Sequence, residues 1–102
     1  MANPKIKILA VSNVYCRLMN FLKKGDSEEG HFHDYDHGTL LATGKVLVEK
    51  FDADRNVIAS KVFTAPTFLF IEKDVAHRLT AMEDNTVATC IHALRSITED
   101  IL

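Results

Sequence analysis

Turn signals divide this chain into short segments, and their spacing constrains the fold more than any other feature of the sequence. The turns are expected at 24–26, 36–38, 52–56, 65–66 and 83–85, where Gly, Pro, Asp and Asn gather. The segments between them are rich in Val, Ile, Thr, Phe and Leu, and predict strands at 5–11, 14–22, 31–35, 39–51, 57–63, 67–71, 75–82 and 86–94. No long stretch keeps apolar residues at helical spacing. The pattern is typical of an all-β sandwich or barrel with little helix.

Length and composition narrow the class of protein. A chain of 102 residues suits one compact domain, here residues 1–102, and is too short for two of ordinary size. The net charge is −2 and the basic residues are scattered, which argues against nucleic acid as a partner. No apolar run is long enough to span a membrane, and no signal-peptide core follows Met1. We therefore expect a cytoplasmic protein without membrane contact, in which Cys16 and Cys90 are free thiols.

Three of the five histidines lie within seven residues, at His31, His33 and His37. Neutral imidazole is the commonest protein ligand for Zn, Fe, Ni and Cu, so the cluster indicates a metal site. The spacing of His33 and His37 would also fit one helix face, but the flanking Gly and Asp residues favour turns. Read as a strand, His31 and His33 share a face, and a tight connection at 34–36 returns His37 to the same place from the next strand.

A fourth histidine is expected to complete this site from across the fold. His77 shares a strand face with Val75 and Leu79, so it should point into an apolar interior, where an unpaired imidazole is costly. Taken alone, a buried histidine is more often a hydrogen-bonded core residue than a ligand. The three histidines upstream favour the ligand interpretation.

The spacing around these histidines resembles that of the cupins, small β-barrels that hold a metal between two motifs. The first cupin motif is Gly, five residues, His-x-His, three or four residues, Glu, six residues and Gly. The matching residues here are Gly25, His31, His33 and Gly44, with His37 where the family usually has Glu. The resemblance covers about residues 20–94, within a barrel core at 14–94 that an N-terminal strand at 5–11 precedes and a tail at 95–102 follows.

The second cupin motif is matched only in part. His77 stands in its histidine position, whereas the usual Pro, Gly and Asn positions hold Glu72, Asp74 and Ala81. The first motif is specific, and the second is weak by itself.

This resemblance to a small, single-domain cupin implies a double-stranded β-helix, or jelly-roll-like, barrel. It also implies a divalent transition metal (Fe, Zn, Ni, Mn or Cu) bound by His31, His33, His37 and His77. Imidazole in place of a carboxylate raises the net charge of the site by one, which favours anionic ligands and makes the metal a stronger Lewis acid. Two alternatives stay open. His37 could be a surface turn residue beside a three-histidine site, or the pocket could bind a small ligand without a metal.

Three further residues are candidates for lining the cavity. Cys90 and His92 share a strand face, and Tyr35 continues the face of His33. Tyr35 and His92 are therefore the candidate catalytic residues, as a proton donor and as an acid or base. The ordinary alternatives are a core aromatic, a packed cysteine and a histidine hydrogen-bonded to the backbone.

Two arginines receive opposite predictions. Arg17 could hold an anion if its strand faces inward, whereas alternation points Arg78 out of the barrel. No catalytic carboxylate is evident, because the acids near the site fall in expected turns: Glu28, Glu29, Asp34 and Asp36.

We expect a metalloenzyme acting on a small, anionic molecule, with Fe(II)-type dioxygenation as the chemistry that the resemblance favours. The alternative is a non-catalytic metal-binding or small-molecule-binding cupin; sugar-nucleotide epimerisation ranks last, because no basic nucleotide groove is evident. A domain of this size buries only part of its apolar surface, so a homodimer is also expected. Residues placed for a barrel core or a sheet-on-sheet dimer are Leu40, Leu47, Val62, Phe68 and Phe70.

Overall fold

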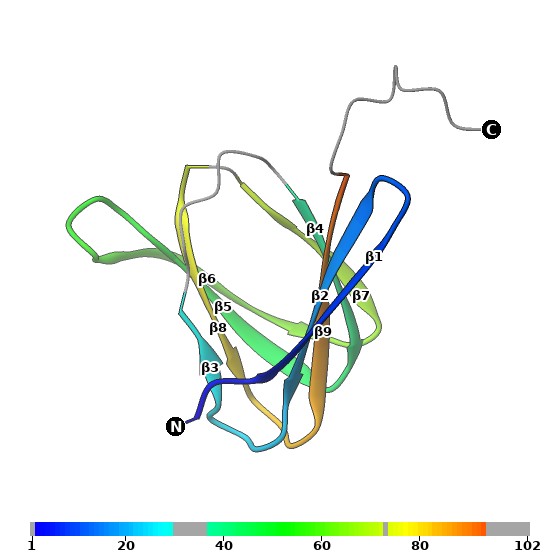
Figure 1. The fold of residues 1–102 in the computed structure, drawn as a ribbon. Helices are drawn as coiled ribbons and strands as arrows, with labels where there is room; N and C mark the ends of the chain where they lie inside the picture. The colour runs from blue at the N-terminus through cyan, green and yellow to red at the C-terminus, as the bar shows by residue number, and fades with distance from the viewer. Residues whose placement is uncertain (1, 30–36, 73, 94–102) are drawn as a thin grey trace.

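The chain folds into two antiparallel sheets that pack face to face (Figure 1). The computed structural model describes residues 2–29, 37–72 and 74–93, together with the backbone but not the side chains of His37 and Ala93. The strands of this described part are β1 (Lys5–Val11), β2 (Val14–Phe21), β3 (Ser27–Glu28), β4 (His37–Thr43), β5 (Lys45–Phe51), β6 (Val57–Thr64), β7 (Thr67–Ile71), β8 (Ala76–Ala81) and β9 (Thr86–Ala93). Within these ranges there is no helix, and hence none long and apolar enough to cross a membrane.

The two sheets differ in size. The five-stranded sheet, which we call sheet A, has the order β1-β2-β9-β4-β7, and the four-stranded sheet B has the order β3-β8-β5-β6. Both contribute to one hydrophobic core, which includes Phe21, Leu41 and Ala88 from sheet A and Val46 and Leu79 from sheet B. Each of these side chains is at most 7% exposed. Side chains alternate along a strand, so the residues two positions before and after a core residue also face the interior.

The expected strands agree with the structure at most positions. The strands at 5–11 and 67–71 have the predicted bounds. The single strand expected at 39–51 is wrong, because the chain turns at Gly44 and passes from β4 in sheet A to β5 in sheet B. Gly44 has φ +86°, a conformation that favours glycine. The short β3 was not predicted, and the strand expected at 31–35 lies outside the described residues.

Candidate functional site

His77 lies on β8 and points between the two sheets, as predicted. Its side chain belongs to the inward face with Leu79 and is 7% exposed. Nδ1 lies 2.9 Å from the carbonyl oxygen of Val75. A carbonyl only accepts hydrogen bonds, so Nδ1 carries the proton and donates it. In the neutral ring the lone pair is then on Nε2, which is the nitrogen that a metal would have to bind.

The environment of His77 favours the neutral ring. Burial lowers the pKa of the His77 imidazole, and the positive charge of Lys50 acts in the same direction. The hydrogen bond to Val75 and the negative charge of Glu72 oppose these effects without reversing them. His77 is therefore held uncharged at neutral pH, which is the form that binds transition metals.

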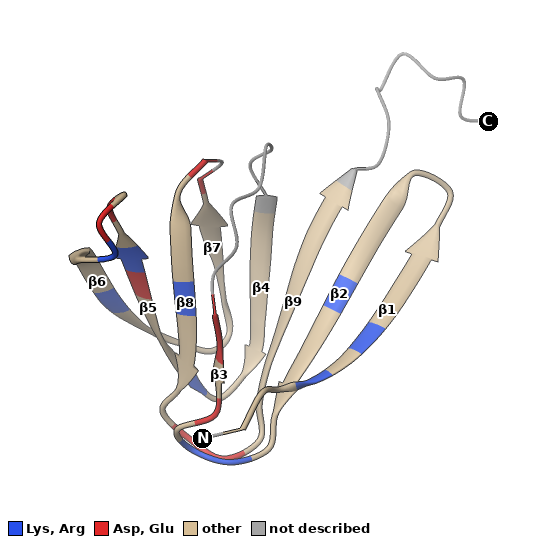
Figure 2. Ribbon diagram, turned by 60° about the vertical axis from the view of Figure 1, so that its left-hand side comes forward, with Lys and Arg blue, Asp and Glu red and all other residues tan. Residues whose placement is uncertain are grey.

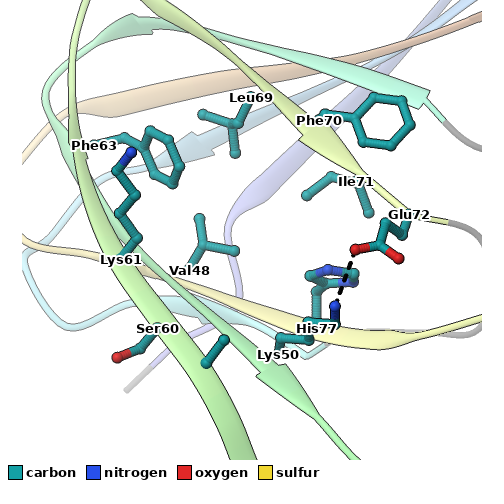
Figure 3. A pocket seen from close by; sticks show the side chains of 11 residues that line it. Val48, Lys50, Ser60, Lys61, Phe63, Leu69, Phe70, Ile71, Glu72 and His77 are labelled. Atoms are coloured by element: carbon teal, nitrogen blue, oxygen red, sulfur yellow. Dashed lines mark hydrogen bonds and ion pairs between the residues drawn. The ribbon is translucent and has the colours of Figure 1, made fainter.

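A pocket of about 340 Å³ opens beside His77 (Figure 3). Its walls come from strands β5, β6 and β8 of sheet B and from the end of β7 in sheet A. Most of the lining is apolar, with Val48, Phe63, Leu69 and Ile71 among its residues. A pocket with an apolar wall and a few polar groups at one end is the usual form of a small-molecule site.

Two charged side chains of this pocket, Lys50 and Glu72, lie beside His77. Lys50 Nζ and Glu72 Oε1 form an ion pair of 2.9 Å, which joins β5 of sheet B to the residue that follows β7 in sheet A. Figure 3 shows this pair next to the imidazole. Lys61 also lines the pocket, and its ammonium lies 5.1 Å from the centre of the Phe63 ring. Among the pocket residues, two lysines face one acid, so the charged groups of the wall carry a net positive charge.

The other three histidines of the predicted site cannot all be placed. His31 and His33 lie outside the described residues, as does Tyr35. The backbone of His37 opens β4, directly opposite Ile71 of β7, and Ile71 lines the same pocket as His77. Strand β4 thus starts two residues before the strand expected at 39–51, and the connection expected at 34–36 lies outside the described residues. Within the described residues no group of three or more metal-ligating side chains comes together.

A second group of polar side chains lies on the inward face of sheet A. Arg17 on β2 shares the face of Met19 and donates from Nη2 to Glu28 Oε1 on β3, at 2.7 Å. Cys90 on β9 lies opposite Arg17, and its Sγ is 3.5 Å from Thr39 Oγ1. Arg17 and Cys90 therefore face the interior from one sheet.

His92 belongs to this inward face by position. It follows Cys90 by two residues on β9 and is half-buried. The expected sharing of one strand face by Cys90 and His92 is confirmed. Burial raises the pKa of the Cys90 thiol, although Thr39 and the charge of Arg17 act against the shift. Cys90 is thus a protonated thiol, and both cysteines are free.

These contacts correct the prediction for Glu28 and confirm the prediction for Arg78. Glu28 was expected in a turn, but it lies on β3, where its side chain is 14% exposed and pairs with Arg17. The prediction failed because a two-residue strand leaves no alternation to recognise. Arg78 points outward, as expected, and pairs with Glu49 at 2.8 Å on the outer face of sheet B.

Sequence reasoning missed Lys50 and Glu72 as pocket residues. Lys50 continues the inward phase of Val46 and Val48, so alternation along β5 would have identified it. Glu72 follows the last residue of β7, and its approach to Lys50 depends on how the two sheets meet. No local signal in the sequence reports that contact.

The donor chemistry of His77 fits a transition metal. Metal-binding histidines usually donate their second ring N–H to a carbonyl or carboxylate, which fixes the tautomer and orients the ring. His77 has this arrangement through Val75, and it is buried and neutral. Of the four predicted ligands, His77 is the one whose side chain the structure describes, and its tautomer and burial are those that a metal ligand requires.

Comparison with solved structures identifies the fold. BH2720 from Bacillus halodurans superimposes with a TM-score of 0.74 at 16% identity, over 89% of this chain and 70% of that protein. KdgF from Halomonas sp. superimposes with a TM-score of 0.71 at 16% identity, over 89% of this chain and 80% of that protein. HppE with Fe(II) and the alternative substrate (S)-1-HPP superimposes with a TM-score of 0.70 at 14% identity, over 85% of this chain and 48% of that protein. No protein-family model and no curated sequence matches the chain.

These superpositions agree with the two-sheet, all-β architecture of the described strands. The chain has the cupin fold, and the resemblance seen in the first histidine motif is confirmed at the level of the fold. With identities of 14–16%, the comparison establishes the architecture and leaves the chemistry to the residues of this chain.

Proposed function

We propose that the protein binds a divalent transition metal between its two sheets, through His31, His33, His37 and His77. The observation that carries the proposal is the hydrogen bond from His77 Nδ1 to Val75, which turns Nε2 of a buried, neutral imidazole into the ligating atom. The position of His37 supports it, because β4 begins there opposite a strand that lines the pocket of His77. Four nitrogen donors suit Fe, Ni, Zn or Cu best, with Mn also admissible.

The pocket supports a metal-dependent enzyme that acts on a small, anionic molecule. Its apolar wall would hold the body of such a molecule, while Lys50 and Lys61 supply positive charge. When bound, the metal would supply Lewis-acid or redox chemistry next to this wall. The Fe(II) in the HppE structure favours an iron-dependent, dioxygenase-type reaction as the first chemistry to test. Tyr35 and His92 are the proposed proton-transfer residues.

The alternative is a cupin that binds a metal or small molecule without catalysis. One observation favours it: Glu72, the acid of the pocket wall, is tied to Lys50 in an ion pair. Oε1 of Glu72 already accepts a hydrogen bond from Lys50 Nζ, so that oxygen is not available to take a proton from a substrate. Coordination separates the two functions, since open positions beside the four imidazoles permit substrate binding and a closed tetrahedral site does not.

The remaining proposals concern partners and location. We expect a small-molecule ligand, a homodimer, and no nucleic-acid or membrane partner. We also expect a cytoplasmic location, which agrees with two free thiols on the described strands.

Metal analysis of the purified protein tests the site. We expect about one transition-metal ion per chain, and its loss in His31→Ala, His33→Ala and His77→Ala variants. His92→Ala is the matched control, because it removes a half-buried histidine from β9 of sheet A, which is outside the proposed ligand set, and should keep the metal. Unchanged metal content in His77→Ala would reject the site.

Two further measurements separate the alternatives. Full metal occupancy and an unchanged metal spectrum in His37→Ala would identify a three-histidine site. Oxygen uptake by the iron-loaded protein, screened across small organic acids and thiols, distinguishes the dioxygenase from the binding protein.

A further inference from the structure

The pocket beside His77 has one apolar wall and one charged wall. Its wall from sheet A is the end of β7, and strands β4, β7 and β9 of that sheet contain no Lys, Arg, Asp or Glu (Figure 2). Its wall from sheet B includes Lys50 on β5 and Lys61 on β6. A molecule that fits both walls therefore has an apolar body and an anionic group at one end.

Lys50 already binds a carboxylate in this structure. Its Nζ donates a hydrogen bond of 2.9 Å to Oε1 of Glu72. Lys50 is the direct partner of His77 in the register of β5 and β8, and Figure 3 shows the ion pair next to the imidazole. The carboxylate of Glu72 thus marks a position beside His77 where a charge-assisted hydrogen bond holds a carboxylate oxygen.

Glu72 is the member of this ion pair that can leave. Its side chain is 53% exposed, whereas that of Lys50 is 31% exposed. Glu72 follows the last residue of β7, while Lys50 lies within β5 and has a paired strand on each side. An exposed ion pair contributes little to stability, so Glu72 can turn to solvent at small cost. Lys50 would then keep its place in the wall and be open to a carboxylate from solution.

The apolar part of the pocket restricts the rest of the ligand. Its volume of about 340 Å³ is near the lower end of the range for small-molecule sites. Val48, Leu69 and Ile71 line it together with the Phe63 ring. The ammonium of Lys61 lies 5.1 Å from the centre of that ring, at the end of the pocket away from His77 (Figure 3). The space between the two ends suits a short aromatic or branched aliphatic group.

We propose that Lys50 selects the ligand of this pocket, a small monocarboxylate with an aromatic or branched aliphatic body, whose carboxylate replaces that of Glu72 on Nζ. Glu72 is then an internal competitor, bound to Lys50 when no ligand is present. The inference rests on the proposed function, because it names the class of the small, anionic molecule. Its ligand contact is made by Lys50, so it can be tested with and without a metal.

Calorimetric titration with phenylacetate, and with isovalerate as the branched aliphatic probe, tests both members of the ion pair. Lys50→Met should weaken binding about tenfold or more, because a charged hydrogen bond is lost. Glu72→Gln should strengthen binding several-fold, because the competing charge is gone. Lys45→Met is the matched control: it removes the same charge from the same strand, but on the face turned away from the pocket, and should leave the affinity unchanged.

The opposite signs separate ligand binding from a structural ion pair. A pair that only held the pocket walls together would give weaker binding in both Lys50→Met and Glu72→Gln, and that result would overturn the proposal. An unchanged affinity in Lys50→Met, or no binding of either probe to the wild-type protein, would also overturn it.

An uncharged analogue gives a second test that needs no variant. Phenylacetamide has the ring of phenylacetate without its charge, so it should bind the wild-type protein about tenfold or more weakly. Equal affinities would show that the apolar wall alone binds the ligand.

Repeating the titrations before and after dialysis against a chelator separates this inference from the metal site, with metal content measured on the same samples. Binding that depends on Lys50 in both samples supports the proposal. Binding that disappears with the metal and is indifferent to Lys50→Met would assign the carboxylate to the metal, which rejects the role of Lys50 and keeps the metal site. Binding through Lys50 in a protein that never contains metal would reject the metal site alone.

Discussion

Arg17 and Glu28 link the two sheets through an ion pair of 2.7 Å, with Arg17 on β2 of sheet A and Glu28 on β3 of sheet B. Their side chains are 29% and 14% exposed, and Arg17 Nη1 also lies 3.3 Å from Met19 Sδ. The pair thus holds the short strand β3 against the inward face of the larger sheet. Lys50 and Glu72 make a comparable link at the pocket.

Replacing Arg17 by Met should lower the free energy of unfolding by about 1–3 kcal/mol, because Glu28 then loses a charged hydrogen-bond donor in a half-buried place. Urea denaturation measures the change. Arg55→Met is the matched control: its ion pair with Glu29 is 3.9 Å long and both side chains are more than half exposed, so the loss should be small. If both variants lost the same free energy of unfolding, the pair between Arg17 and Glu28 would stabilise the fold no more than an exposed ion pair does.

The pKa of the Cys90 thiol predicts a pH dependence of stability. Burial raises this pKa, so the folded protein keeps the thiol proton to a higher pH than the unfolded chain, whose thiol titrates near pH 9. The stability that the protonated Cys90 thiol contributes is therefore complete below that pH. It is lost as the pH rises towards the pKa of the folded protein, where the free energy of unfolding falls by at most about 1.4 kcal/mol per pH unit. Urea denaturation of the wild type and of Cys90→Ala between pH 7 and 10 should show a smaller decline in the variant. Identical slopes would contradict the prediction.

The strands and the inward residues were predictable from local pattern, because alternation is a property of each strand alone. His77, Cys90 and Arg78 fall on the expected faces for this reason. The passage of the chain between sheets at Gly44 and the approach of Glu72 to Lys50 were not predictable, because both depend on contacts between residues far apart in sequence. The predicted metal ligands fall between these two cases. Their spacing in the sequence suggested all four histidines, and His77 is the one whose imidazole the structure describes.

Removal of the proposed metal should destabilise the wild-type protein. A ligand that binds the folded chain adds RT ln(1 + [L]/Kd), about 2.7 kcal/mol at a hundredfold excess over Kd. We expect a lower Tm after dialysis against a chelator and recovery when the metal is returned, followed by circular dichroism. His77→Ala should melt at the same temperature with and without chelator, because the buried ligand is missing. A chelator effect that persists in this variant would place the metal elsewhere.

Gly44→Ala should be one of the most damaging small substitutions in the chain. A Cβ at Gly44 would collide with the Oγ1, Cα and Cβ atoms of Thr86, which is fully buried, and the φ of +86° adds backbone strain. Thr86 Oγ1 donates to the carbonyl oxygen of Glu83 at 2.9 Å, so it cannot move away without losing that bond. Strain and overpacking together should cost about 2–5 kcal/mol.

The Gly25→Ala variant separates backbone strain from the collision with Thr86. Gly25 has a similar φ of +94°, but no atom lies within 4 Å of its added Cβ, so its variant should lose only the backbone term of about 1–2 kcal/mol. Urea denaturation of both variants gives the comparison. A larger loss for Gly44→Ala shows that the contact with Thr86 fixes the turn between β4 and β5, where the chain leaves sheet A for sheet B. Equal losses would mean that Thr86 yields, and that conformation alone makes glycine necessary at this turn.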